Sequence, residues 1–279
     1  MASPAPREGR AFHELPLVFF SALGVAGGGI GTANLLGVVL VGGDLALSRA
    51  EAGLLSALLV LGALLSAGHL GQPMRGPLAL RGVVRSALSN EILALGVALA
   101  GGLFAALLPA DHTLQGAAGL LASLGSLAFL LTLGAVYNLP GQLAWRGPVV
   151  IYPLVLGTAW GLLLSAGLDG GPAREATIRL LWAALLVDGA LVLIRNSGME
   201  RVKRVGAPSH PRIFRVRGLL MGARLAVSTI ATPLSLLSGY WGLALFALSG
   251  ALILDRYGFY GLAVKKTSES EVARVERLL

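Results

Sequence analysis

Five ionisable residues fall between two apolar stretches that are each long enough to cross a bilayer: His69, Arg75, Arg81, Arg85 and Glu91. His69 ends the first stretch and Glu91 begins the second. Ionisable groups beside hydrocarbon are costly, so in membrane segments they commonly mark functional sites. Histidine titrates near neutral pH, and a partly buried carboxyl group can exchange protons in the same range. The cluster therefore indicates a proton-exchanging site at one membrane edge.

The composition places the chain in lipid. Hydrophobic residues make up 55% of the 279 residues, charged residues only 13%, and the mean hydropathy is +0.77, which excludes an ordinary soluble surface. A helix of about 17–25 apolar residues spans the ~30 Å hydrocarbon layer. Eight runs of this kind are present, and none shows the period-two alternation of a membrane barrel. They are Leu15–Val41, Ala52–His69, Asn90–Pro109, Leu114–Tyr137, Pro148–Leu168, Ala176–Ile194, Gly218–Leu234 and Leu237–Tyr257.

The expected fold is therefore an all-α integral membrane protein, a bundle of eight transmembrane helices. We expect a polar N-terminal segment at 1–14, the transmembrane domain at 15–257 and a polar C-terminal tail at 258–279. Two GxxxG spacings in the first span, Gly24/Gly28 and Gly27/Gly31, predict close helix packing and not a nucleotide loop, because no strand precedes them.

The chain has no cysteine, which excludes disulfides, thiolate zinc sites, iron–sulfur clusters held by this chain and covalent haem attachment. The four histidines, His13, His69, His112 and His210, are too few and too scattered for a two-haem bundle. A single haem between His13 and His69 stays open. Nothing in the sequence predicts a metal site or a nucleic-acid partner.

Charge predicts the orientation. Eight spans put both termini on one side of the membrane, and most of the 22 Lys and Arg residues fall on that side. By the positive-inside bias the chain is expected in the cytoplasmic (inner) membrane with cytoplasmic termini. The alternative is that this basic face docks an acidic partner. The longest connection, Arg195–Arg217, is either a solvated loop touching anionic head groups or a dock for a soluble subunit.

Two charged residues fall inside predicted spans. Asp188 lies seven residues before Arg195, and Arg224 lies seven residues after Arg217, so each is expected about 10 Å inside the same boundary. Because consecutive antiparallel helices bring equal depths together, we predict an Asp188–Arg224 ion pair, structural or a proton relay. In the alternative, Arg224 extends to the interface and Asp188 takes a hydroxyl partner.

Five segments in order resemble the membrane anchor subunit family of DMSO reductase, nearly from end to end. They are His13–Phe20, His69–Pro73 followed by Arg75, Leu88–Ile92, the Tyr137/Pro140/Trp145 segment and Asp255–Tyr260. The resemblance implies eight spans and a subunit that binds menaquinol without a redox centre of its own. It also implies two partners in anaerobic electron transport: a four-cluster iron–sulfur subunit receives the electrons, and a molybdopterin catalytic subunit receives them next.

The resemblance implies that His69 and Glu91 are the quinol-linked residues. Two departures matter: Asn90 stands where arginine is usual, and Gly258 replaces a bulkier residue. Quinol oxidation releases two electrons and two protons, so the site needs proton acceptors. We expect His69 to bind and deprotonate one hydroxyl group while Glu91 accepts or relays the other proton.

Three further residues complete the expected quinol site: Arg75, which tunes Glu91 or orients the head group, and the wall candidates His13 and Tyr257. Simpler interpretations stay open. His69 can be an interfacial residue with a satisfied N–H, Glu91 can favour a helix N-terminus through the dipole, and the arginines can be positive-inside determinants.

Two other function classes compete with the quinol-oxidising anchor. One is a secondary transporter that uses Asp188 and Arg224 inside the membrane. The other is a purely structural anchor without quinone chemistry. The terminal substrate belongs to the catalytic partner, so this chain does not name it.

Overall fold

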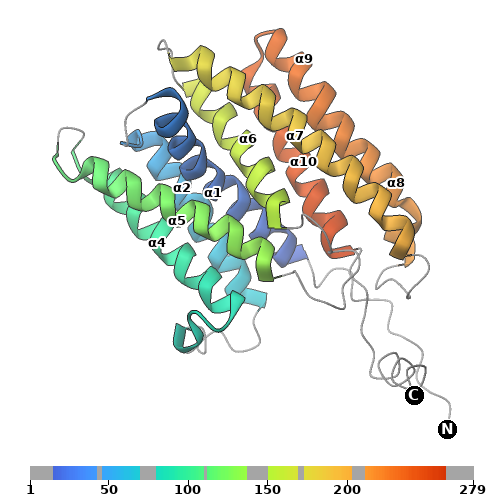
Figure 1. The fold of residues 1–279 in the computed structure, drawn as a ribbon, viewed down its shortest axis with the longest axis horizontal. Helices are drawn as coiled ribbons and strands as arrows, with labels where there is room; N and C mark the ends of the chain where they lie inside the picture. The colour runs from blue at the N-terminus through green and yellow to red at the C-terminus, as the bar shows by residue number, and fades with distance from the viewer. Residues whose placement is uncertain are drawn as a thin grey trace.

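The computed structural model describes residues 15–42, 46–69, 80–109, 112–136, 150–168, 173–202 and 211–261, and within them every regular element is helical (Figure 1). Eight helical segments of this part of the chain are long and apolar enough to cross a membrane. The predicted all-α fold with eight spans is confirmed. The elements are α1 (Leu15–Val41), α2 (Arg49–His69), η3 (Leu80–Gly82), α4 (Ala87–Leu107), α5 (Gln115–Val136), α6 (Ile151–Leu168), α7 (Ala173–Val202), α8 (Pro211–Ala226), η6 (Val227–Ala231), α9 (Thr232–Leu237) and α10 (Trp241–Gly261).

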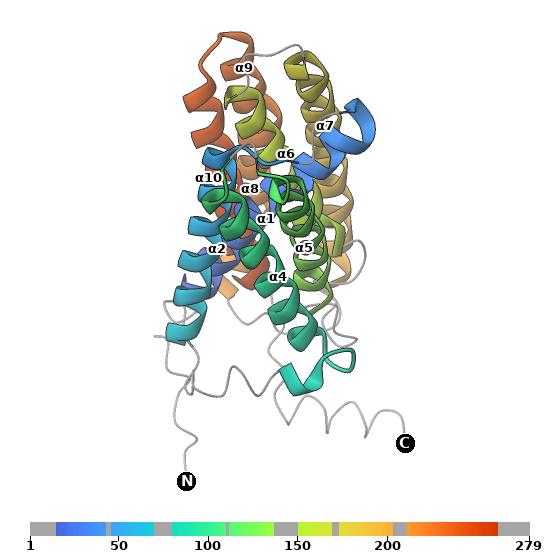
Figure 2. The same cartoon turned by 90° about the vertical axis from the view of Figure 1, so that its left-hand side faces the viewer.

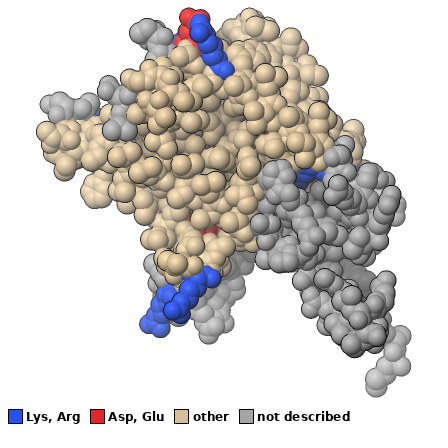
Figure 3. All heavy atoms as spheres, in the orientation of Figure 1, with Lys and Arg blue, Asp and Glu red and all other residues tan. Residues whose placement is uncertain are grey.

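The exterior of the described bundle is apolar, as a lipid-facing surface must be. Leu186, Leu219 and Phe246 are each about three-quarters exposed, at 74%, 74% and 76%. Figure 3 shows that most of the visible described surface carries no charge, and that the charged side chains seen on it lie near the ends of the molecule. A water-soluble monomer rarely exposes such a large apolar surface, whereas contact with lipid tails carries no such cost.

The seventh span and the connection before it differ from the prediction. α7 continues to Val202, and α8, the π-helical turn η6 and α9 continue one another from Pro211 to Leu237. Placing Arg195 in a long loop was therefore wrong. The predicted span ends at Ile194, just before Arg195, but a charge can stay in a helix when a partner on a neighbouring helix offsets its desolvation.

Glycine sets the spacing around α1, which packs against α2, α5, α6 and α10. A Cβ on Gly29 would overlap the backbone carbonyl of Gly157 on α6, so the two helices cross backbone to backbone. Gly24 and Gly28 face α5, where an added Cβ would meet Phe129 and Leu130. The predicted close packing of the GxxxG glycines is thus observed, and it makes α1 the central helix.

α2 and α4 have their site-bearing ends on the same side of the bundle. α2 ends at His69, α4 begins at Ala87, and the two helices pack against each other. Figures 1 and 2 show the end of α2 and the beginning of α4 at the same end of the bundle. The backbone of His69 and the whole of Glu91 therefore lie near one membrane edge.

Candidate functional site

Glu91 is buried in the first half of α4, with 4% of its surface exposed. It forms no ion pair or hydrogen bond with another residue of the described ranges. α4 begins at Ala87, so Glu91 lies beyond the first turn, where the helix dipole has little effect. The dipole therefore does not explain this carboxyl group, and burial without a partner is costly for it.

The turn before α4 is held by Asn90. The Oδ1 atom of Asn90 accepts a hydrogen bond from the backbone N–H of Val84 at 2.8 Å. Val84 has a φ of 73°, a left-handed conformation that a β-branched residue rarely adopts. Ser89, next to Asn90, is buried against Gly82 of η3. Asn90 thus fixes the turn that leads to Glu91.

Several predicted site residues lie outside the described parts of the chain or at their limit. His13 and Arg75 lie outside the described residues, so their places in the quinol site stay predictions, and the alternative of a haem between His13 and His69 is not tested. The backbone of His69 ends α2, while its side chain is not described.

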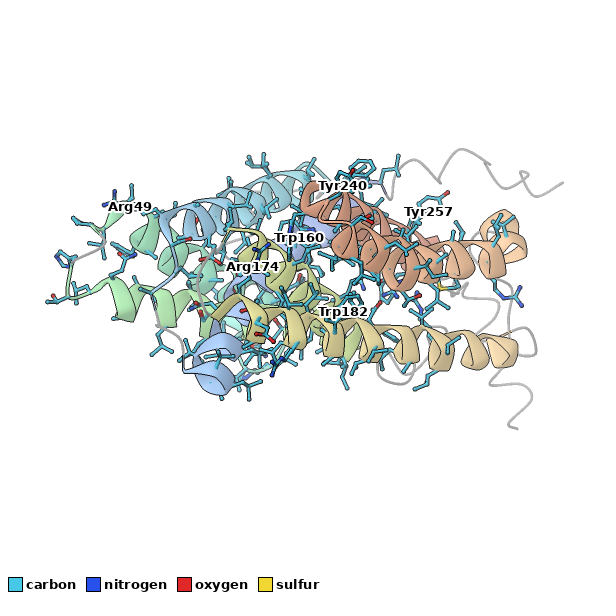
Figure 4. The ribbon with its side chains drawn as sticks, turned by 90° about the horizontal axis from the view of Figure 1, so that it is seen from above. Arg49, Trp160, Arg174, Trp182, Tyr240 and Tyr257 are labelled. Atoms are coloured by element: carbon cyan, nitrogen blue, oxygen red, sulfur yellow. The ribbon has the colours of Figure 1, made fainter. Side chains whose placement is uncertain are left out.

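Tyr257 lies on α10 and projects away from α7 in Figure 4. α10 packs against α1, which also packs against α2. Tyr257 is thus one helix removed from the α2–α4 pair, and its place in the wall of the site stays a prediction.

The second cluster of ionisable residues begins with the pair that the sequence predicts. The carboxylate of Asp188 on α7 accepts hydrogen bonds from Nη1 and Nη2 of Arg224 on α8, at 2.6 and 2.5 Å. The Arg224 side chain is 0% exposed and that of Asp188 1% exposed. The bidentate geometry is the strongest arrangement for an arginine and a carboxylate.

Sequence reasoning missed the rest of this cluster. Asp255 on α10 accepts hydrogen bonds from Arg195 Nη1 at 3.0 Å and from Arg256 Nη2 at 2.6 Å. The Nε atom of Arg224 lies 3.5 Å from Asp255 Oδ1, which joins this group to the predicted pair. One signal was available: Asp188 and Arg195 are seven residues apart, so they share one face of α7.

Aromatic rings enclose Arg195. Its guanidinium carbon lies 5.5 Å from the centre of the Tyr152 ring and 5.6 Å from that of Phe259. The hydroxyl group of Tyr152 donates a hydrogen bond to the backbone oxygen of Leu191 at 2.8 Å. The rings contribute cation–π attraction and hold the guanidinium plane in one orientation.

The other end of the bundle carries polar contacts of a structural kind. Ser48 and Glu51 form a capping box at the start of α2, and Ser165 Oγ donates to Glu51 Oε1 at 2.6 Å. The guanidinium carbon of Arg174, a residue labelled in Figure 4, lies 4.5 Å from the centre of the Trp241 ring. Among the described residues, no group of three or more His, Asp or Glu side chains could hold a metal ion.

Comparison with known proteins adds a family match. The family model described as DMSO reductase anchor subunit (DmsC) matches residues 9–199, which is more than half of the chain. No curated protein matches the chain. The matched range includes His13, His69, Arg75, Glu91 and Asp188, whereas Arg224, Asp255 and Tyr257 lie beyond it.

Proposed function

The chain belongs to the DMSO reductase anchor subunit family, and from this premise we propose that it binds and oxidises menaquinol where α2 ends and α4 begins. As a member of the family it is a multi-pass membrane anchor subunit. The proposal concerns the chemistry and the place of the site. The observation that carries it is Glu91, a buried carboxyl group with no partner in the described structure, on the helix that follows His69.

The chemistry of a quinol fits this carboxyl group. A quinol offers two hydroxyl groups, and its oxidation breaks both O–H bonds, releases two electrons and leaves a quinone. A carboxylate that is buried away from water and from other charges is stabilised by a hydrogen bond from a hydroxyl group, and it can then accept the proton of that group. We assign this step to Glu91.

His69 takes the second proton in this proposal. An imidazole titrates near neutral pH, so it can accept a proton from the other hydroxyl group and release it to water at the membrane edge. Arg75, six residues after His69, orients the head group or acts on Glu91. His13 and Tyr257 contribute to the wall of the site.

The electrons leave through partner subunits. We propose that a four-cluster iron–sulfur subunit docks near this end of the bundle and passes them to a molybdopterin catalytic subunit. In this proposal the chain holds no haem and no iron–sulfur cluster, and its lack of cysteine supports the second point. The positive-inside bias supports a cytoplasmic membrane location with cytoplasmic termini. Arg81 and Arg85, both exposed before α4, contribute to that bias.

A secondary transporter is less well supported. Its evidence is Asp188 and Arg224, but these two residues pair with each other, and Arg224 also lies 3.5 Å from Asp255 within one buried network. Family membership accounts for the eight spans without transport. The following experiment distinguishes a structural anchor without quinone chemistry from the proposed quinol-oxidising subunit.

The test uses the complete complex with Glu91→Gln and His69→Gln made separately. Quinol-dependent turnover is compared with turnover driven by a small artificial electron donor that reduces the partner subunits directly. Loss of a general base typically costs 10²–10⁴-fold, so we expect quinol-dependent turnover to fall by about 10²-fold or more while artificial-donor turnover is retained. Two matched controls, Glu175→Gln and His112→Gln, change residues at the opposite end of the bundle.

Equal quinol-dependent turnover in Glu91→Gln and Glu175→Gln would remove Glu91 from the mechanism. The same comparison of His69→Gln with His112→Gln decides the role of His69. If both site variants keep full quinol-dependent turnover, the chain is a structural anchor and the proposal fails.

A further inference from the structure

The buried cluster on α7, α8 and α10 carries an unbalanced charge. It contains three arginines and two aspartates, so its formal charge is +1: Arg195, Arg224, Arg256, Asp188 and Asp255. Each of these residues has at most 7% of its surface exposed. A buried charge without a counter-ion is strongly destabilising in a membrane protein. Counted over the described side chains, the cluster is therefore short of one negative charge.

The vacant hydrogen-bonding capacity is concentrated on Arg195. Its Nη1 atom donates to Asp255, but its Nε and Nη2 atoms are buried and have no hydrogen-bond partner in the described structure. Nε–H and Nη2–H point the same way along one edge of a guanidinium group. This edge binds two oxygen atoms of a carboxylate or phosphate at once. An entire recognition edge is thus buried and unused.

The surroundings hold this edge ready for a ligand. Arg195 is paired with Asp255, and its guanidinium carbon lies over the rings of Tyr152 and Phe259. A preorganised guanidinium loses little further side-chain entropy on binding. Arg195 therefore binds one carboxylate through Nη1 and has its Nε–Nη2 edge available for a second anion.

The position along the helices identifies the source of the anion. Arg195 is the last residue of the membrane-spanning part of α7, and Asp255 lies five residues before the end of the span Trp241–Tyr260. Arg195 therefore lies at the end of its apolar span, near the level of the lipid head groups, and Asp255 lies about 7–8 Å inside the end of its own span. Basic sites between transmembrane helices at this level bind phospholipid head groups.

We propose that the Nε–Nη2 edge of Arg195 binds the phosphate group of an acidic membrane phospholipid. Two phosphate oxygens accept the two unused N–H groups. A phosphodiester carries one negative charge, which is the charge that the cluster lacks. The lipid thereby joins α7 to α10 at the membrane edge, at a site separate from the α2–α4 end that carries the proposed quinol chemistry.

The test measures lipid binding to the purified full chain with its partner subunits in detergent. Native mass spectrometry follows the titration with phosphatidylglycerol, and the midpoint of thermal unfolding is recorded in parallel. Two comparison ligands are a glycosyl diacylglycerol, which lacks phosphate, and inorganic phosphate alone. The variants are Arg195→Gln and Arg195→Lys; the lysine keeps a charge for Asp255 but has no bidentate edge.

We expect phosphatidylglycerol to bind the unmodified protein and raise its unfolding temperature, and the glycolipid to do neither. Arg195→Lys weakens phosphatidylglycerol binding at least tenfold. Arg85→Gln is the matched control, since it removes an exposed arginine on the same side of the membrane, and it stays within twofold of the unmodified protein. Arg195→Lys keeps the comparison valid where Arg195→Gln does not fold.

Three outcomes overturn the proposal. Equal phosphatidylglycerol binding by the unmodified protein and Arg195→Lys removes Arg195 from the site. Stabilisation by inorganic phosphate that equals that by phosphatidylglycerol replaces the lipid with a free anion. Loss of a copurifying subunit in Arg195→Lys, with lipid binding unchanged, identifies a partner's carboxylate as the occupant.

Discussion

Asp188 and Arg224 meet through two parallel hydrogen bonds, from Nη1 to Oδ2 at 2.6 Å and from Nη2 to Oδ1 at 2.5 Å, although they are 36 residues apart in the chain. The contact joins α7 to α8 inside the membrane-spanning part of the bundle. A buried pair of this kind offsets its own desolvation only while both partners are present. The contact is therefore a point where loss of one side chain has a large effect.

Asp188→Asn should destabilise the protein strongly. The substitution removes the negative charge and leaves the fully buried Arg224 facing only Asp255. Breaking a buried pair from one side costs about 3–5 kcal/mol. The measurement is the unfolding midpoint of the detergent-solubilised protein.

The matched control is Glu175→Gln, which breaks the Glu175–Arg179 pair, whose side chains are 76% exposed. An exposed pair contributes about 0–1 kcal/mol, so this variant should unfold close to the unmodified protein. Similar midpoints for the two variants would show that the buried pair contributes no more than a surface pair.

Gly29→Ala should prevent α1 and α6 from packing. The added methyl group would overlap the backbone of Gly157, which cannot move aside as a flexible side chain can. We expect a loss of at least about 2 kcal/mol of stability or failure to accumulate folded protein. Gly37→Ala on the same helix is the control, because a Cβ there meets nothing within 4 Å. The measurement is the yield of folded protein after solubilisation. Equal yields for Gly29→Ala and Gly37→Ala would contradict the backbone contact between α1 and α6.

The sequence predicted those features of the fold that depend on local composition. Hydropathy located all eight spans, and α1 begins and ends at the predicted residues, Leu15 and Val41. Equal depth in antiparallel neighbours predicted the partnership of Asp188 and Arg224. Both inferences work because the thickness of the bilayer sets the length of each membrane helix, and with it the depth of each residue, independently of the other helices.

Features that depend on distant partners were not predicted. The sequence predicted Arg195 to be the first residue of a loop. Its burial is offset by the ion pair with Asp255, which lies 60 residues later and cannot be inferred from the local sequence. In the same way, the sequence placed Glu91 at a helix start but did not reveal that none of the described side chains pairs with it. Burial of a charge and the absence of its counter-ion are properties of the packed bundle and not of any one segment.

Tyr152→Phe should lower stability by about 1 kcal/mol. The change removes the hydrogen bond to the backbone oxygen of Leu191 but keeps the ring beside Arg195. Tyr152→Leu should cost more, because it also removes the cation–π contact and leaves a cavity. Tyr240→Phe is the control, since Tyr240 is 66% exposed (Figure 4). Equal unfolding midpoints for the phenylalanine and leucine variants at Tyr152 would show that the ring does not support Arg195.

Asn90→Ala should loosen the turn before α4. It removes the acceptor for the Val84 N–H and leaves a β-branched residue at a φ of 73° without compensation. Arg81 and Arg85 flank Val84 and are exposed, so trypsin can report on the opening of this turn. Loss of about 1 kcal/mol raises the open population about fivefold, and cleavage follows that population when opening is fast.

The companion variants separate the hydrogen bond from the backbone conformation. Val84→Gly in the Asn90→Ala background should lower the cleavage rate again, because glycine adopts positive φ without strain. Thr132→Ala, a change on α5 whose hydroxyl bonds only to its own helix, should leave cleavage at Arg81 and Arg85 unchanged. Cleavage sites are assigned from fragment masses. If Asn90→Ala is cut no faster than Thr132→Ala, the turn is held by α4 packing and not by the Asn90 side chain, and Asn90 has no part in placing Glu91.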